Sequence, residues 1–187
     1  MGRTYSQLEL LNSEIERIES TRFVDRLFYV LTKTKKVVLK INIPSRSLFR
    51  VNILCEDVTI VGEFEEKFTL SELTDILFKD FLDEVRKNEN FDALYNRLKV
   101  RSKKKPTIRH NDCEYEIEQE GICQEVKISI ERSAALRGEV LLSDLTNIYP
   151  NHMFQLESLL ELILLDFLIE YSKGNTRNVV STIINKL

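Results

Sequence analysis

Two stretches of this chain match each other at a constant spacing of about 87 residues. The motif Lys40-Ile41-x-Ile43 recurs as Lys127-Ile128-x-Ile130, and in the same frame Arg50 matches Arg137. After the loss of one residue, the block that begins with Asp80-Phe81-Leu82 recurs from Asp166 onward. A repeat of this length spans a whole small module, so it predicts architecture rather than chemistry.

The repeat divides the 187 residues into two modules of about 90 residues, each near the lower limit of domain size. The predicted organisation follows from this division. It comprises an N-terminal helix (residues 1–22), a first module (23–88), a helical and basic linker (89–110), and a second module with a C-terminal helix (111–187).

Hydrophobic periodicity predicts the same plan in each module. Alternating apolar residues favour strands at about 26–31, 37–43 and 49–60, and the capping pattern Thr69-x-x-Glu72 precedes a helical stripe. The second module matches with strands at 113–119, 125–132 and 136–147 and a helix at about 153–172. Both modules therefore read α-β-β-β-α.

The predicted fold class is α+β, a tandem pseudo-repeat of two α-β-β-β-α modules with antiparallel sheets and helices on one face. This element order resembles that of RWD-type interaction modules, and in part that of type III secretion chaperones. The sequence carries no motif of either family, since Tyr149-Pro150 alone is no signature. The resemblance is therefore topological, and it assigns no residue a role.

The sequence lacks the patterns expected of an enzyme or a metalloprotein. The two histidines, His110 and His152, have no Ser, Cys or Asp pattern of known mechanics beside them. There is no glycine-rich phosphate loop, and the three cysteines have no metal-ligand spacing. We therefore predict no catalytic, cofactor or metal residue and no cofactor, and we expect a protein that is not an enzyme.

Composition and segment length favour an intracellular protein. The apolar fraction is 43% with a net charge of −3, and no secretory signal opens the chain. The most apolar run, residues 156–171, is too short and too acidic to span a membrane. We expect a cytoplasmic or otherwise intracellular chain with reduced cysteines.

Two apolar surfaces are candidates for binding a partner. Strand alternation in the first hairpin places four apolar side chains on its outer face: Leu27, Tyr29, Leu31 and Val38. The N-terminal helix, the second module, a partner or a second copy can cover them. The second closing helix carries Leu165 and Ile169 where the first has Lys79 and Asp83. We expect the C-terminal helix to pack on these two residues; the alternative is that they pair two chains.

Basic residues form a second kind of candidate. Those of the first hairpin and of the linker include Lys33, Lys35, Lys36, Arg101, Lys103, Lys104 and Lys105. Such residues can bind a phosphate backbone or an acidic protein surface, and they can also form a solvated linker.

The function predicted from sequence is a non-catalytic scaffold or adaptor for protein–protein interaction, built from a duplicated module. It would be a subunit of a larger complex or a homo-oligomer. The alternative is a nucleic-acid-associated factor that uses the basic first hairpin and the basic linker at 97–109.

Overall fold

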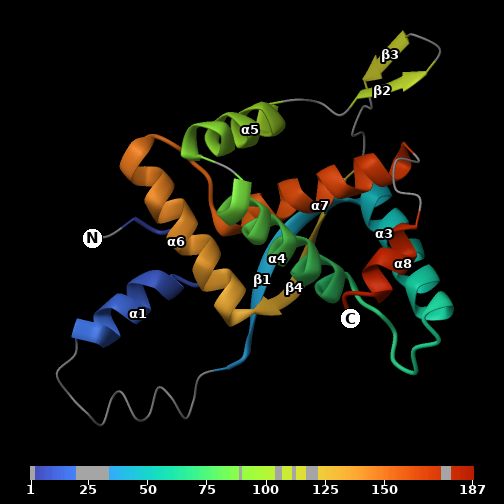
Figure 1. The fold of residues 1–187 in the computed structure, drawn as a ribbon, viewed down its shortest axis with the longest axis horizontal. Helices are drawn as coiled ribbons and strands as arrows, with labels where there is room; N and C mark the ends of the chain where they lie inside the picture. The colour runs from blue at the N-terminus through green and yellow to red at the C-terminus, as the bar shows by residue number, and fades with distance from the viewer. Residues whose placement is uncertain are drawn as a thin grey trace.

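The computed structural model describes residues 3–19, 34–88, 90–103, 107–110, 113–116, 122–173 and 178–187. These residues form a mixed α and β fold (Figure 1). In chain order the elements are α1 (Leu10–Glu19), β1 (Lys36–Pro44), α3 (Ser45–Val61), α4 (Leu70–Asn88), α5 (Phe91–Lys103), β2 (Thr107–His110), β3 (Cys113–Glu116), β4 (Cys123–Glu131), α6 (Arg132–Ile148), α7 (Leu156–Ser172) and α8 (Val179–Ile184).

The central feature is a two-stranded antiparallel ribbon made by β1 and β4, which lie side by side in Figure 1. The register runs from Lys36 opposite Glu131 to Pro44 opposite Cys123, so Lys40 faces Lys127 at its middle. These two lysines are also the matching positions of the sequence repeat. A second short hairpin joins β2 to β3.

The strands form because apolar residues alternate along them and bury one face of the ribbon. In β1 the buried residues are Val37, Leu39, Ile41 and Ile43, and in β4 they are Ile128 and Ile130. Each strand leads directly into a helix and then a second one, giving the order strand, helix, helix twice: β1–α3–α4 and β4–α6–α7.

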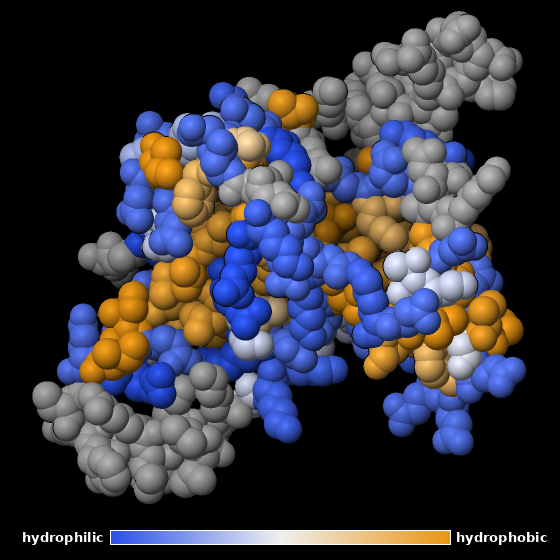
Figure 2. Space-filling view, in the orientation of Figure 1, coloured by the Kyte–Doolittle hydropathy of each residue, from blue (hydrophilic) through white to orange (hydrophobic). Residues whose placement is uncertain are grey.

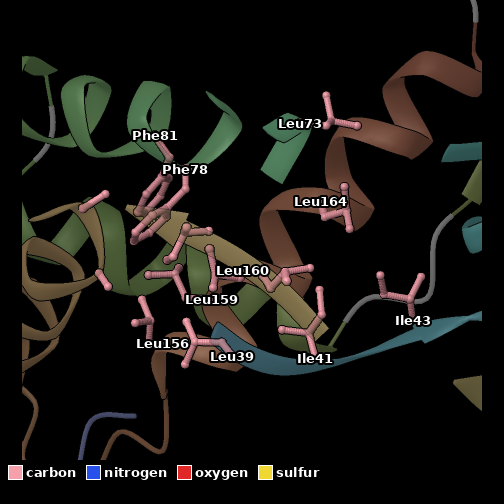
Figure 3. Close-up of a cluster of buried hydrophobic side chains, with 14 of the residues drawn as sticks. Leu39, Ile41, Ile43, Leu73, Phe78, Phe81, Leu156, Leu159, Leu160 and Leu164 are labelled. Carbon is pink, nitrogen blue, oxygen red and sulfur yellow. The ribbon is translucent and has the colours of Figure 1, made fainter. Parts of the chain in front are cut away.

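The buried face of the ribbon belongs to one hydrophobic core. Side chains of β1 meet side chains of α4 and α7 there (Figure 3). Leu39 and Ile41 lie near Leu159 and Leu160 of α7, with Phe78 of α4 above them. The same cluster also takes in residues of α3, α5, β4 and α6.

The second helix of each segment crosses to the strand of the other segment. α4 packs along β4, whereas α7 packs along β1. Both outer ribbon edges are thereby covered, and helix side chains accept their backbone N–H groups. The backbone N–H of Glu131 donates to Asp75 Oδ1 at 2.8 Å, and the backbone N–H of Asn42 donates to Glu161 Oε1 at 2.6 Å. Each edge is thus closed to further strand pairing.

The mixed α and β composition of the predicted fold is confirmed, but the α-β-β-β-α order of the modules is wrong. Residues 49–60 and 136–147, predicted as third strands, belong to helices α3 and α6. In α3 the buried residues Val51, Leu54, Cys55 and Val58 follow the helical spacing of three and four. β3 pairs with β2 and not with β4. The predicted strand at 26–31 lies outside the described residues.

Both terminal helices are confirmed as elements. α1 (Leu10–Glu19) lies within the predicted range 1–22 and packs against α6. α8 packs against α3, and Lys186 forms an ion pair with Asp80 of α4. The docking of α8 on Leu165 and Ile169 of α7 stays a prediction, and both of those side chains are half-buried.

Candidate functional site

The face of the β1–β4 ribbon that points away from the core is polar. β1 places alternate residues on it, and Val38 is the apolar member, with 54% of its surface exposed. β4 contributes its own alternate residues, because side chains on a strand point to opposite faces. The residues of this ribbon face are Lys36, Val38, Lys40 and Asn42 from β1, with Glu125, Lys127, Ser129 and Glu131 from β4.

The middle of the ribbon face is positively charged. Lys40 and Lys127 lie directly opposite each other, and Lys40 Nζ also contacts Glu125 Oε1 at 2.8 Å. The two side chains of this ion pair are both about half exposed, so water competes with the contact. Lys40 and Lys127 therefore place two ammonium groups on one exposed surface.

The acidic residue at the end of the ribbon is held by a helix. Glu131 accepts a hydrogen bond from Lys79 of α4 at 2.9 Å, and this bond lowers the pKa of the Glu131 carboxyl. Lys79 also binds Asp75 at 2.9 Å. The charge of Glu131 is thus directed toward α4, away from the centre of the face.

Strand β1 and the residues that flank it at both ends are basic. From residue 34 to residue 50 the chain contains no acid. Lys35 and Lys36 are exposed before and at the start of β1, and Arg46 and Arg50 are exposed in the first turns of α3. This segment is therefore basic in a chain whose net charge is −3.

The candidate residues from sequence fall into three groups. Val38, Lys35 and Lys36 lie at the ribbon, while Leu165 and Ile169 lie half-buried on α7. Arg101 and Lys103 belong to the last turn of α5. Leu27, Tyr29, Leu31, Lys33, Lys104 and Lys105 lie outside the described residues.

Sequence reasoning missed Asn42, Lys127 and Ser129 as candidate residues. The signal was present, because the repeat places the same alternating strand at both sites. Among the described residues next to β1 there is only the helix that follows it, so the repeat copy of the strand was the available partner. The assignment of residues 49–60 as a strand hid this pairing.

Two buried groups away from the ribbon, His152 and Cys55, are not arranged for catalysis. His152 Nδ1 accepts the Phe154 N–H at 3.2 Å, and Nε2 lies 2.8 Å from Thr146 Oγ1. Burial lowers the pKa of His152, which keeps the ring neutral. Burial also raises the pKa of the Cys55 thiol to about 11, so this cysteine is not a thiolate nucleophile at neutral pH.

A cleft of about 410 Å³ lies between α4 and α6. Its apolar lining is made by Leu82, Val85, Val140 and Leu141, and charged residues such as Arg86 and Arg137 surround it. Figure 2 shows apolar surface on this side of the molecule along α6, and a second region around α3 and α8. The cleft is open, and its lining contains no histidine or cysteine.

The described part of the chain offers no site for a bound metal, since no three of its His, Cys, Asp or Glu residues are grouped for one. Within the same residues, no helix combines the length and hydropathy needed to cross a membrane. No protein family, curated protein or solved structure matches the chain.

Proposed function

We propose that this protein binds double-stranded DNA and that the β1–β4 ribbon enters the major groove. The observation that carries the proposal is the largely exposed polar face of the β1–β4 ribbon, whose other face is buried and which pairs with no further strand among the described residues. The major groove of B-DNA is about 12 Å wide and admits a two-stranded β-ribbon. Strands lie about 4.8 Å apart, so two strands with their side chains fit that width.

The side chains of the ribbon face have the chemistry needed to contact base edges. Lysine donates to the O6 and N7 acceptors of guanine, and asparagine pairs with the N6 and N7 of adenine. Serine can form a hydrogen bond with either base. Lys40, Lys127, Asn42 and Ser129 are of these types. Lys35, Lys36, Arg46 and Arg50 are exposed and would supply the phosphate contacts beside the groove.

We also propose that β1–α3–α4 and β4–α6–α7 are the two copies of a tandem repeat. The sequence match at an offset of 87 supports this proposal. The strand register supports it too, because Lys40 pairs with Lys127, the residue that occupies the same position in the other copy. Under this proposal, a pseudo-twofold axis through that lysine pair relates the two copies. The backbone of B-DNA has twofold axes of its own, so one chain can present to it what a dimer usually presents.

The test uses the full chain and fluorescently labelled random-sequence duplex DNA, with binding measured across a salt series. We expect the double variant Lys40→Ala with Lys127→Ala to bind at least ten-fold more weakly. Its salt slope should change little, because Lys40 and Lys127 are proposed to contact base edges and the residues proposed to contact phosphates are unchanged.

The matched control is Lys67→Ala with Lys87→Ala, which removes the same charge from exposed sites off the ribbon. It should change affinity much less. Equal losses in both double variants would mean that net charge alone governs binding. A wild-type chain that fails to bind duplex DNA at low salt would contradict the proposal.

A second candidate function is the non-catalytic scaffold or adaptor expected from sequence, in a larger complex or a homo-oligomer. The apolar cleft between α4 and α6 favours it, together with Phe49 of α3, whose surface is 68% exposed. If two chains associate through the cleft, light scattering will show a mass that rises with concentration. Val140→Arg should then restore the monomer mass, whereas Val61→Arg, an exposed valine outside the cleft, should not.

A further inference from the structure

The two halves of the ribbon face carry different side chains at positions that the sequence repeat matches. On one side of the Lys40–Lys127 pair, Val38 lies opposite Ser129. On the other side, Asn42 lies opposite Glu125. The offset of 87 makes Val38 the counterpart of Glu125, and Asn42 the counterpart of Ser129. The pseudo-twofold axis therefore relates identical residues at its centre and different residues on its flanks.

We infer that the protein recognises an asymmetric DNA site in which a symmetric centre is flanked by two different half-sites. This inference rests on the proposed DNA binding and adds to it the class of sequence that is read. A symmetric dimer presents the same side chains to both half-sites and so selects palindromes. This single chain presents Val38 and Ser129 on one flank and Asn42 and Glu125 on the other. It therefore does not select a palindrome.

Each flank favours different bases by its chemistry. The Val38 methyl groups match the C5-methyl of thymine, and Ser129 accepts from or donates to either base. Asn42 matches the N6 and N7 of adenine, and the Glu125 carboxylate accepts from the N4 amino group of cytosine. We expect thymine to be enriched beside Val38, and adenine and cytosine beside Asn42 and Glu125.

Glu125 also supplies discrimination by repulsion. A carboxylate has no proton to donate, so it is unfavourable beside the O6 and N7 acceptors of guanine. Its contact with Lys40 Nζ at 2.8 Å partly offsets the charge that it brings near the phosphates. Guanine should therefore be depleted at the position that Glu125 contacts, and its counterpart Val38 exerts no such exclusion.

The test is selection of binding sequences from a randomised duplex pool by the full chain. The wild type should enrich a motif whose two halves are not inverted copies. The double variant Glu125→Val with Ser129→Asn gives β4 the flanking residues of β1 and should enrich a palindrome. The reciprocal variant Val38→Glu with Asn42→Ser should enrich a different palindrome, so the result does not depend on one variant folding.

The outcomes separate this inference from the proposed function. On the wild-type motif, exchanging one half for the inverted copy of the other should weaken binding about ten-fold, the cost of one mismatched contact. A palindromic wild-type motif would overturn the inference and leave DNA binding intact, as would binding with no enriched motif. Asymmetric motifs from properly folded forms of both variants would overturn it too. No binding to any duplex would instead remove the proposed function.

Discussion

At the scale of single residues, buried polar side chains join segments that are far apart in sequence. Glu139 of α6 is fully buried and accepts hydrogen bonds from the Ser6 hydroxyl and from two backbone N–H groups at the start of α1. The Leu11 N–H lies 2.6 Å from Glu139 Oε2. A helix N-terminus has unpaired N–H groups, so this carboxylate both satisfies α1 and fixes it to α6.

We expect Glu139→Ala to lower the free energy of unfolding by about 2–4 kcal/mol, because it leaves several buried donors without an acceptor. Glu139→Gln keeps one acceptor oxygen and should cost less. Urea denaturation measures both. The control Glu16→Ala removes an exposed carboxylate from α1 and should change stability by no more than about 0.5 kcal/mol. An equally small effect of Glu139→Ala would show that α1 is not held by this carboxylate.

His152 predicts how stability depends on pH. Burial lowers its pKa in the folded state, so below about pH 6.5 the unfolded chain binds more protons at this residue than the folded chain does. Its contribution to stability is therefore present above that pH and is lost as the pH falls. Urea midpoints at pH 7.5 and 5.5 should differ more for the wild type than for His152→Gln. Identical pH dependence in the two proteins would contradict this expectation.

Gly138 allows α4, α6 and α7 to approach closely. A Cβ added there would lie 2.7 Å from Phe78 Cζ and 2.7 Å from Leu156 Cδ1, and both of those side chains are fully buried. We expect Gly138→Val to cost about 1–3 kcal/mol by overpacking. The exposed helical position Asn147 provides the control: Asn147→Val should be nearly neutral in thermal melts. Comparable melting temperatures for the two variants would mean that the three helices can separate at little cost.

At the scale of elements, each strand of the ribbon depends on a helix from the other segment. Glu161 of α7 accepts the Asn42 N–H of β1, and burial raises the pKa of this carboxyl. On the opposite edge, Ser71 and Asp75 of α4 accept the N–H groups of Ser129 and Glu131. These contacts satisfy edge amides that would otherwise be open to another strand.

We expect Glu161→Ala to cost about 0.5–1.5 kcal/mol, since the Asn42 N–H loses its protein acceptor and must be satisfied by water. Glu161→Gln keeps a carbonyl oxygen in place and should retain most of the stability. Equilibrium unfolding gives both values, and light scattering of the alanine variant tests whether the freed edge promotes aggregation. If alanine and glutamine behave alike, the hydrogen bond contributes little to the ribbon edge.

Helix and strand assignments from sequence failed where the two periodicities compete. Residues 49–60 contain many β-branched residues, among them Val51, Val58 and Thr59, which favour a strand by propensity. The buried positions nevertheless follow helical spacing, and Pro44 stands immediately before the helix at its N-cap. The capping box at Thr69 and Glu72 was predicted correctly, because its two hydrogen bonds are local.

At the scale of the whole molecule, the two strand–helix–helix segments are intertwined. α4 covers the strand of the second segment, α7 covers the strand of the first, and both contribute to one core. Neither segment alone can bury its strand edge or its apolar face. The domain boundaries predicted from sequence thus separate two segments that share a core.

We expect fragments 1–105 and 106–187 to be largely unfolded as separate monomers and to fold when mixed in a 1:1 complex. The reason is that each lacks the helix that covers its strand. Circular dichroism and sizing of each fragment and of the mixture provide the measurement. A fragment that unfolds cooperatively as a monomer would show that the segment is an independent domain.

The sequence by itself determined the features that depend on neighbouring residues. The alternation in β1, the capping box before α4 and the match between two halves of the chain can all be read from local spacing. Only the tertiary structure decided which strand pairs with which, that the ribbon has one bare polar face, and that the helices exchange partners. Those outcomes depend on contacts between residues such as Lys40 and Lys127, or Asn42 and Glu161, which lie far apart along the chain. Local periodicity shows that a strand has an apolar face, but only packing shows what covers it.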